Sequence, residues 1–184
     1  MNLWRAWITF ALTLVLACCT TPAQRPTGAP GNSAELLRQW NDLGRRLIAM
    51  AEDFPQEKYG FKPAPTVRSF IEQLLHMAGS NYLFTNAALG QPSPGPESES
   101  PEKFKTKAEV VAYVKKSFED GAAVIRSKGD AGMNQSVNNP EGGKPIRLLG
   151  LGYSLLEHSG EHYGQLVVYY RIAGLVPPES RPRK

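Results

Sequence analysis

The sequence predicts an all-α protein built as a four-helix bundle. Four segments of about 20 residues repeat apolar side chains every three or four positions, which is the spacing of one helix face. Polar stretches rich in Pro and Gly separate these segments, and almost no segment shows the alternation of a strand. Of the 184 residues, 41% are hydrophobic and 21% are charged, so the chain can form a packed core and global disorder is excluded.

The first 17 residues predict a secretory signal segment that precedes the fold. An uncharged apolar run from Ala6 to Ala17 follows one Arg, and the run is too short to span a membrane comfortably. The letters VLAC, which end at Cys18, resemble a bacterial lipobox and predict a lipid on Cys18. The alternative is an ordinary cleaved signal with incidental cysteines. We therefore expect an exported protein on the periplasmic or cell-surface side, held to the membrane by an N-terminal lipid anchor.

Residues 18–33 are rich in Pro, Gly and Thr and predict a flexible tether. The bundle domain is expected over residues 34–178, followed by a polar tail over residues 179–184. Both cysteines of the chain lie at the end of the signal, which excludes a disulfide or a thiolate metal ligand in the domain. The net charge of +4 is spread along the chain without a basic block interleaved with aromatic residues, so we expect no nucleic-acid partner.

The first two helices are bounded by capping residues and prolines. The first is predicted over residues 33–54, with Ser33 as its N-cap and Pro55 directly after its end. Its apolar side chains recur at helical spacing: Leu36, Trp40, Leu43, Leu47 and Ala51. The second is predicted over residues 66–89, with Thr66 as its N-cap and a glycine after its end.

The third helix is predicted over residues 106–127, where apolar side chains again gather on one side. A loop rich in Gly and Asn follows over residues 128–145. The fourth helix is predicted over residues 146–173, because Gly174 is a typical C-terminal cap and two prolines after it forbid continuation.

All three histidines of the chain fall on predicted helices. His158 and His162 are four residues apart, so they share a helix face, with their Cβ atoms about 6 Å apart. Leu155 and Leu166 lie on the same face, which places the pair toward the bundle interior. A metal ion would supply partners for both imidazoles, and this spacing suits zinc. The alternative is two core histidines that hydrogen-bond to carbonyl or Tyr hydroxyl groups.

Apolar periodicity alone does not decide where His76 lies. Its position on the predicted helix is compatible with the protein surface and with a polar cleft between two helices. Glu72 precedes it by four residues on the same face, and is a candidate to accept a hydrogen bond from a ligand or to act as a general base. A solvated carboxylate is the alternative. Gln165 is a candidate to hydrogen-bond a metal-bound water, and Glu161 is expected to be a surface charge.

Three other residues of the fourth helix are expected to have structural roles. Tyr163 and Tyr169 are expected to be core aromatics. Gly160 lowers helix propensity by about 1 kcal/mol relative to Ala. Close packing of a neighbouring helix would explain a glycine at this position.

Two stretches resemble the signatures of the DinB-like (damage-inducible) four-helix-bundle superfamily. They are residues 54–84 (FPQEKYGFKPAPTVRSFIEQLLHMAGSNYLF) and residues 157–180 (EHSGEHYGQLVVYYRIAGLVPPES). The resemblance implies that one divalent metal ion is bound by a histidine of the second helix and by a His-x-x-x-His pair of the last helix. These ligands correspond to His76, His158 and His162, and all three are present.

The resemblance also implies a class of chemistry. Members of the family resemble metal-dependent hydrolases and thiol-dependent S-transferases. We expect a hydrolase that uses water bound to an ion held by three histidines. The ion is expected to be Zn²⁺, with Ni²⁺, Fe²⁺ or Mn²⁺ as alternatives. A non-catalytic lipoprotein that binds a metal or ligand is the other class of function. The partners expected are a small molecule of unknown identity, as substrate or ligand, and the membrane. The protein is expected to be a monomer or a homodimer.

Overall fold

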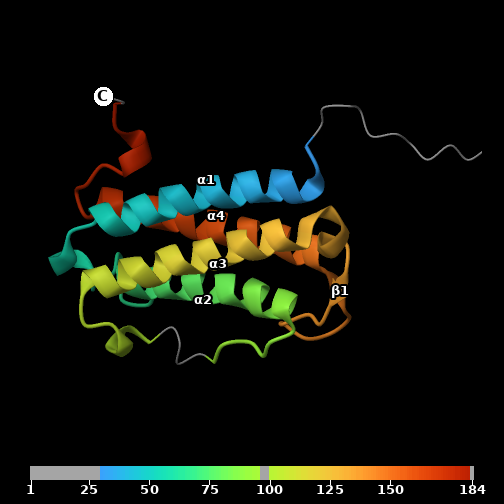
Figure 1. Ribbon diagram of the computed structural model, residues 1–184. Coiled ribbons are helices and arrows are strands. Elements are labelled where there is room, and N and C mark those ends of the chain that lie inside the picture. Colours follow the sequence, from blue (N-terminus) through green and yellow to red (C-terminus); the bar gives the residue numbers. More distant parts are fainter. Residues whose placement is uncertain (1–29, 96–99, 183–184) are drawn as a thin grey trace, which may run out of the picture.

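The computed structural model describes residues 30–95 and 100–182, so the predicted signal segment and Cys18 lie outside the described residues. Four long helices lie side by side (Figure 1): α1 (Asn32–Asp53), α2 (Phe70–Leu89), α3 (Lys107–Met133) and α4 (Leu148–Ile172). The prediction of an all-α four-helix bundle is confirmed. None of the helices in the described ranges is both long and apolar enough to cross a membrane.

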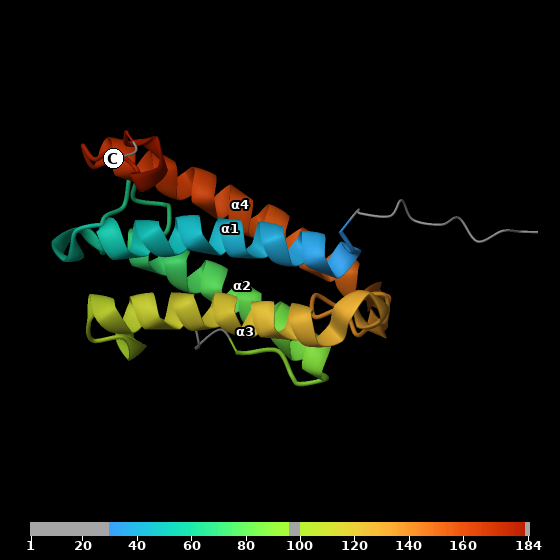
Figure 2. The same ribbon diagram turned by 45° about the horizontal axis from the view of Figure 1, so that its top comes forward.

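The helices form a square in which α1 lies diagonally across from α2, and α3 lies diagonally across from α4. Both α1 and α2 pack against α3 and against α4. The helices α1 and α4 run in one direction along the bundle, and α2 and α3 run in the other (Figures 1 and 2). A two-residue antiparallel ladder between β1 (Ser136–Val137) and β2 (Ile146–Arg147) leads the chain into α4. This arrangement makes α2 and α4 antiparallel neighbours.

Two of the predicted N-caps are wrong. The helix α1 begins at Asn32, with Gly31 as N-cap. Ser33 lies inside the helix, where its amide and hydroxyl donate to a carboxylate oxygen of Asp130, at 2.8 and 2.7 Å. The helix α2 begins after Ser69 rather than Thr66. A capping box closes its first turn, because the Ser69 side chain accepts from the amide of Glu72 and the Glu72 side chain accepts from the amide of Ser69.

The third helix is longer than predicted. Thr106, at the start of the predicted range, is its N-cap and forms a capping box with Glu109. Near the predicted end, Gly129 adopts φ 55°, which breaks the regular helix, and a further turn then reaches Met133. The fourth helix ends at Ile172, and Gly174 follows with φ 76°. Glycine reaches such positive φ values without strain, so both positions suit it.

A close contact between α1 and α3 holds one side of the core. The indole Nε1 of Trp40 donates to the carbonyl of Phe118 at 2.9 Å, and the two rings meet edge to face. A Cβ atom added to Gly121 would lie 2.3 Å from the Trp40 ring, so only glycine fits beneath the indole. The remaining core side chains are mostly aliphatic and aromatic and come from all four helices.

We predict that Gly121→Ala destabilises the protein, although Ala favours a helix by about 1 kcal/mol over Gly. The clash with Trp40 should outweigh that gain, since overpacking costs about 1–3 kcal/mol. Gly150→Ala is the control, because a Cβ there meets only Ile146 at ordinary distances of 3.7 Å and more. Urea unfolding should show a loss for the first variant and no loss for the second. Equal stabilities would contradict the contact.

Candidate metal centre

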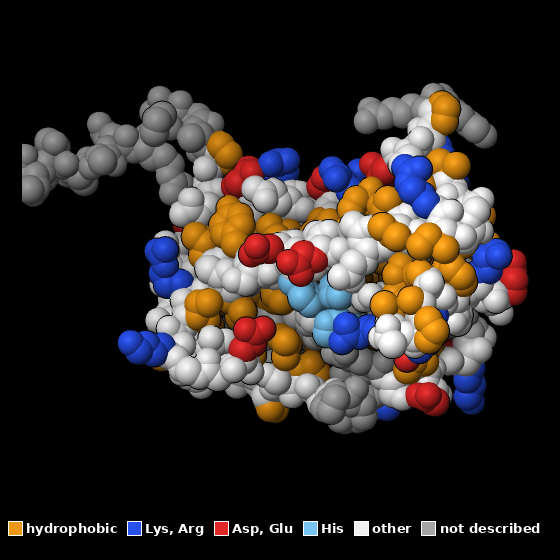
Figure 3. Space-filling model, turned by 180° about the vertical axis from the view of Figure 1, so that it is seen from behind, with side chains coloured by type: hydrophobic (Ala, Val, Ile, Leu, Met, Phe, Trp, Pro, Cys, Tyr) orange, Lys and Arg blue, Asp and Glu red, His pale blue; other side chains and the backbone are white. Residues whose placement is uncertain are grey.

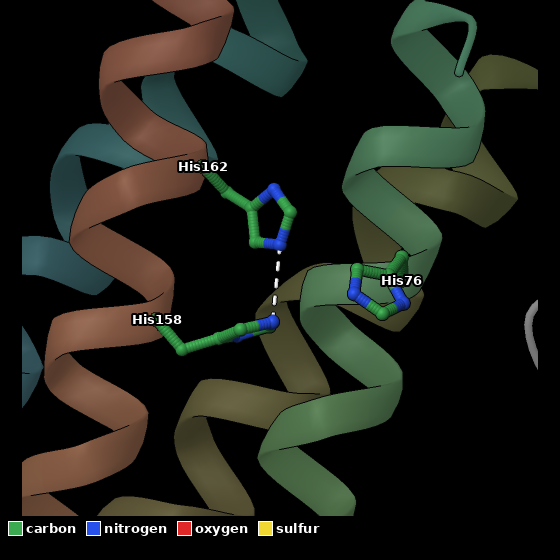
Figure 4. Close-up of side chains that lie close together, drawn as sticks. All are labelled: His76, His158 and His162. Carbon is green, nitrogen blue, oxygen red and sulfur yellow. Dashed lines mark hydrogen bonds between the residues drawn. The ribbon is translucent and has the colours of Figure 1, made fainter. Parts of the chain in front are cut away.

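Three histidines from two helices meet at one point of the bundle wall. His76 comes from α2, and His158 and His162 come from α4. One ring nitrogen from each lies within 4.8 Å of the other two. Figure 4 shows the three side chains turned toward one another across the gap between the helices. The packing of α2 against α4 thus settles the position of His76, which periodicity left open.

The protonation of the pair follows from its hydrogen bonds. Nδ1 of His162 lies 2.9 Å from the amide oxygen of Gln165, and Nε2 of His162 lies 3.1 Å from Nε2 of His158. With an amide oxygen as acceptor, neutral His162 carries its proton on Nδ1. Its Nε2 lone pair then points toward the other histidines. Gln165 therefore orients the His162 ring, a role that differs from the contact with a metal-bound water expected from the sequence.

The site combines a buried floor with an open face. His162 is only 5% exposed, whereas His76 and His158 are half-buried. Seen from behind, the histidines form a patch at the surface, with acidic side chains on one side and a basic side chain beside them (Figure 3). Because His76 and His158 are only half-buried, solvent reaches their imidazoles.

Burial keeps the pair neutral. Desolvation, together with the nearby rings of His158 and His76, lowers the pKa of His162 from 6.5 to about 4. Desolvation also lowers the pKa of His158, followed by the influence of His76. The positive charge of Arg68 acts in the same direction on both. At neutral pH both side chains hold the uncharged form that a metal ligand requires.

A polar link fixes α2 relative to α4 beside the histidines. The hydroxyl of Tyr169 donates to the carbonyl of Arg68 at 2.5 Å, and the side-chain amide of Gln73 donates to the same hydroxyl at 3.3 Å. Tyr169 is buried, as expected of a core aromatic, but its polar role was not predicted. The signal was present in the sequence, because a buried Tyr hydroxyl requires a partner and Tyr169 follows His162 by seven residues on one face.

Glu72, the candidate general base, belongs to the N-terminal cap of α2. The carboxylate of Glu72 accepts hydrogen bonds from the amide and hydroxyl of Ser69, both at 2.6 Å, and pairs with Lys62 at 3.3 Å. The hydrogen bonds from Ser69 and the pairing with Lys62 lower the pKa of Glu72 to about 2, which makes it a weak base.

Two residues of α4 were expected to lie outside the metal site. Glu161 is exposed, as predicted. The expectation for Gly160 is wrong, because a Cβ added there would meet nothing within 4 Å.

The donor set fits a divalent metal ion such as zinc. Zinc–nitrogen bonds of about 2.0–2.1 Å in a tetrahedron place ligand nitrogens about 3.3 Å apart. The separation of 3.1 Å between the Nε2 atoms of His158 and His162 is close to this value, and one ring nitrogen of His76 lies within 4.8 Å of theirs. Three imidazoles fill three positions and leave another for a substrate or water.

Sequence comparison assigns the family. The model of the DinB superfamily matches residues 39–166, a range that contains the three histidines. The chain belongs to the DinB superfamily. It is also 26% identical over 126 residues to the uncharacterized protein YjoA of Bacillus subtilis, an alignment that covers 68% of this chain and 80% of YjoA.

Solved structures share the DinB fold with this chain. A DinB-like protein from Bacillus cereus superposes with a TM-score of 0.67 at 17% identity, covering 78% of this chain and 93% of that one. The structure of YjoA from B. subtilis gives 0.64 at 22% identity, with coverages of 82% and 99%. YfiT from B. subtilis, described as "a probable metal-dependent hydrolase with an unusual four-helix bundle topology", gives 0.61 at 14% identity, with coverages of 83% and 94%.

We predict that the metal-free protein loses stability as the pH falls from about 7 to 5. The unfolded chain takes up a proton on His162 near pH 6.5, whereas the folded chain does so only near pH 4. The unfolded state therefore binds more protons in this range, and the free energy of unfolding should fall by about 2 kcal/mol from His162 alone. Urea unfolding of His162→Gln should show a clearly flatter pH profile. An unchanged profile would contradict the burial of this imidazole.

Proposed function

We propose that this DinB protein binds one divalent metal ion, with zinc as the first candidate, and hydrolyses a small-molecule substrate at that ion. The single observation that carries the proposal is the meeting of three imidazoles, from His76, His158 and His162, at a place partly open to solvent. Closed structural zinc sites have four protein ligands, whereas catalytic sites have three and an open position. The structural likeness to YfiT, described as a probable metal-dependent hydrolase, supports the same class.

Each residue of the site has a separate role in the proposed reaction. His76, His158 and His162 would hold the ion, and Gln165 keeps Nε2 of His162 free of its proton by accepting from Nδ1. When bound, a divalent ion lowers the pKa of a water ligand toward neutrality and polarises a carbonyl group. Glu72 is occupied by the cap of α2 and by Lys62, so we assign it to the helix cap rather than to proton transfer.

The test is a screen of zinc-loaded protein against ester, amide and thiol-adduct substrates, each with and without added thiol. We expect hydrolysis of one class without thiol, a loss of at least 100-fold on chelation, and recovery when zinc is restored. His158→Ala and His162→Ala should lose both the metal and the activity. Glu72→Gln is the control and should keep both, because it alters the helix cap and leaves the three ligands in place.

Other outcomes would replace the proposal. Turnover that requires added thiol would indicate an S-transferase. Tight zinc binding without turnover of any class would indicate a binding protein. Hydrolysis that survives His158→Ala would place the active site elsewhere.

We propose further that the protein is exported and anchored through Cys18, on the basis of the apolar run and the VLAC letters before it. Cys18→Ser should abolish labelling by a radioactive lipid precursor in growing cells. Cys19→Ser is the matched control and should leave the labelling intact. Labelling that persists in Cys18→Ser would contradict the anchor, and loss in both variants would show that the segment rather than the thiol is required.

A further inference from the structure

The outer face of α4 carries charges that the fold leaves without partners. Glu157, Gly164 and Arg171 are all exposed and follow one another at intervals of seven residues. Seven residues make nearly two helical turns, so the three lie in line along the helix. Within residues 30–95 and 100–182, neither Glu157 nor Arg171 forms an ion pair.

The same face is shaped for close approach. A Cβ added to Gly160 or to Gly164 would meet nothing within 4 Å, so both glycines open onto solvent and not onto a neighbouring helix. Beyond them, Val168 and Ile172 are 51% and 57% exposed. Figure 3 shows hydrophobic side chains gathered on this side of the molecule, toward its C-terminal end. The helix thus combines two positions without side chains and two exposed apolar side chains on its outer side.

The charged, apolar and glycine positions of this face are arranged symmetrically in sequence on either side of Gly164. Glu157 and Arg171 are each seven residues from it, and Gly160 and Val168 are each four residues from it. In an antiparallel pair of α4 helices with a two-fold axis at Gly164, every residue meets its counterpart at equal distance on the other side. We propose that α4 docks in this way against α4 of a second copy of this chain.

Such a pair satisfies charge and shape together. Each Glu157 would face the other copy's Arg171, which gives two ion pairs about 10 Å from the axis. Each Val168 would lie over the other copy's Gly160, where the absence of side chains lets the backbones approach. Because opposite charges alternate with apolar residues on one face, its complement is the same face turned around, which favours a second copy over a membrane surface.

The dimer would leave the histidines accessible. His158 and His162 lie about 120° and 160° around α4 from Gly164 at 100° per residue. They face α2, whereas the docking face points away from it. The proposal therefore stands independently of the metal chemistry, and a dimer would carry two separate sites.

The test is sedimentation velocity of the full chain in detergent across the micromolar range. We expect the wild-type chain to dimerise, Glu157→Arg and Arg171→Glu each to weaken dimerisation at least tenfold, and the double variant to recover to within about threefold of wild type. Glu119→Arg and Arg126→Glu are the controls, because they reverse the same two residue types at exposed positions of α3. They should leave the dimer unchanged.

A second variant separates docking from folding. Gly164→Leu should abolish the dimer without lowering the melting temperature, since the added side chain meets no atom of its own fold. A monomeric wild-type chain, an effect of the α3 controls as large as that of the α4 reversals, or a double variant that stays weak would each overturn the proposal.

Discussion

The site depends on how α2 and α4 lie against each other. His76 belongs to one helix and the pair of His158 and His162 to the other, so no local sequence feature alone brings the three nitrogens within 4.8 Å. Apolar stripes hold the helices together but tolerate sliding. The hydrogen bond from Tyr169 to the carbonyl of Arg68 fixes the register. A slip of one helical turn, about 5.4 Å, would carry His76 out of reach of the pair.

Burial of the imidazoles lowers the free energy of unfolding of the metal-free protein in acid. The same burial keeps the imidazoles neutral, which is the form that binds a metal. Burial of His162 and half-burial of His158 depress the pKa of each, which weakens the metal-free fold in acid but presents neutral nitrogens at pH 7. An all-apolar wall between α2 and α4 would avoid this penalty. Bound metal would recover the stability through mass action, because it binds the folded state and not the unfolded one.

Most of the fold could be predicted from the sequence, because apolar periodicity and proline positions depend on local chemistry. The pair His158 and His162 followed from spacing in the same way. His76 did not, because α2 is buried on most sides, including at Leu74, Leu75 and Met77, and its helical wheel shows no single polar face. The cap of α2 was misplaced because Thr66 and Ser69 are both good N-caps, and the glutamate three positions after Ser69 decides between them.

The measurement that tests the central claim most directly is X-ray absorption at the zinc edge of the zinc-loaded protein. The account predicts three nitrogen neighbours of imidazole type at about 2.0–2.1 Å with one further oxygen or nitrogen. In His76→Ala, which removes the only ligand from α2, the imidazole count should fall by one and zinc affinity should drop. A spectrum with only oxygen neighbours, or one that His76→Ala leaves unchanged, would show that the three histidines do not hold the metal together.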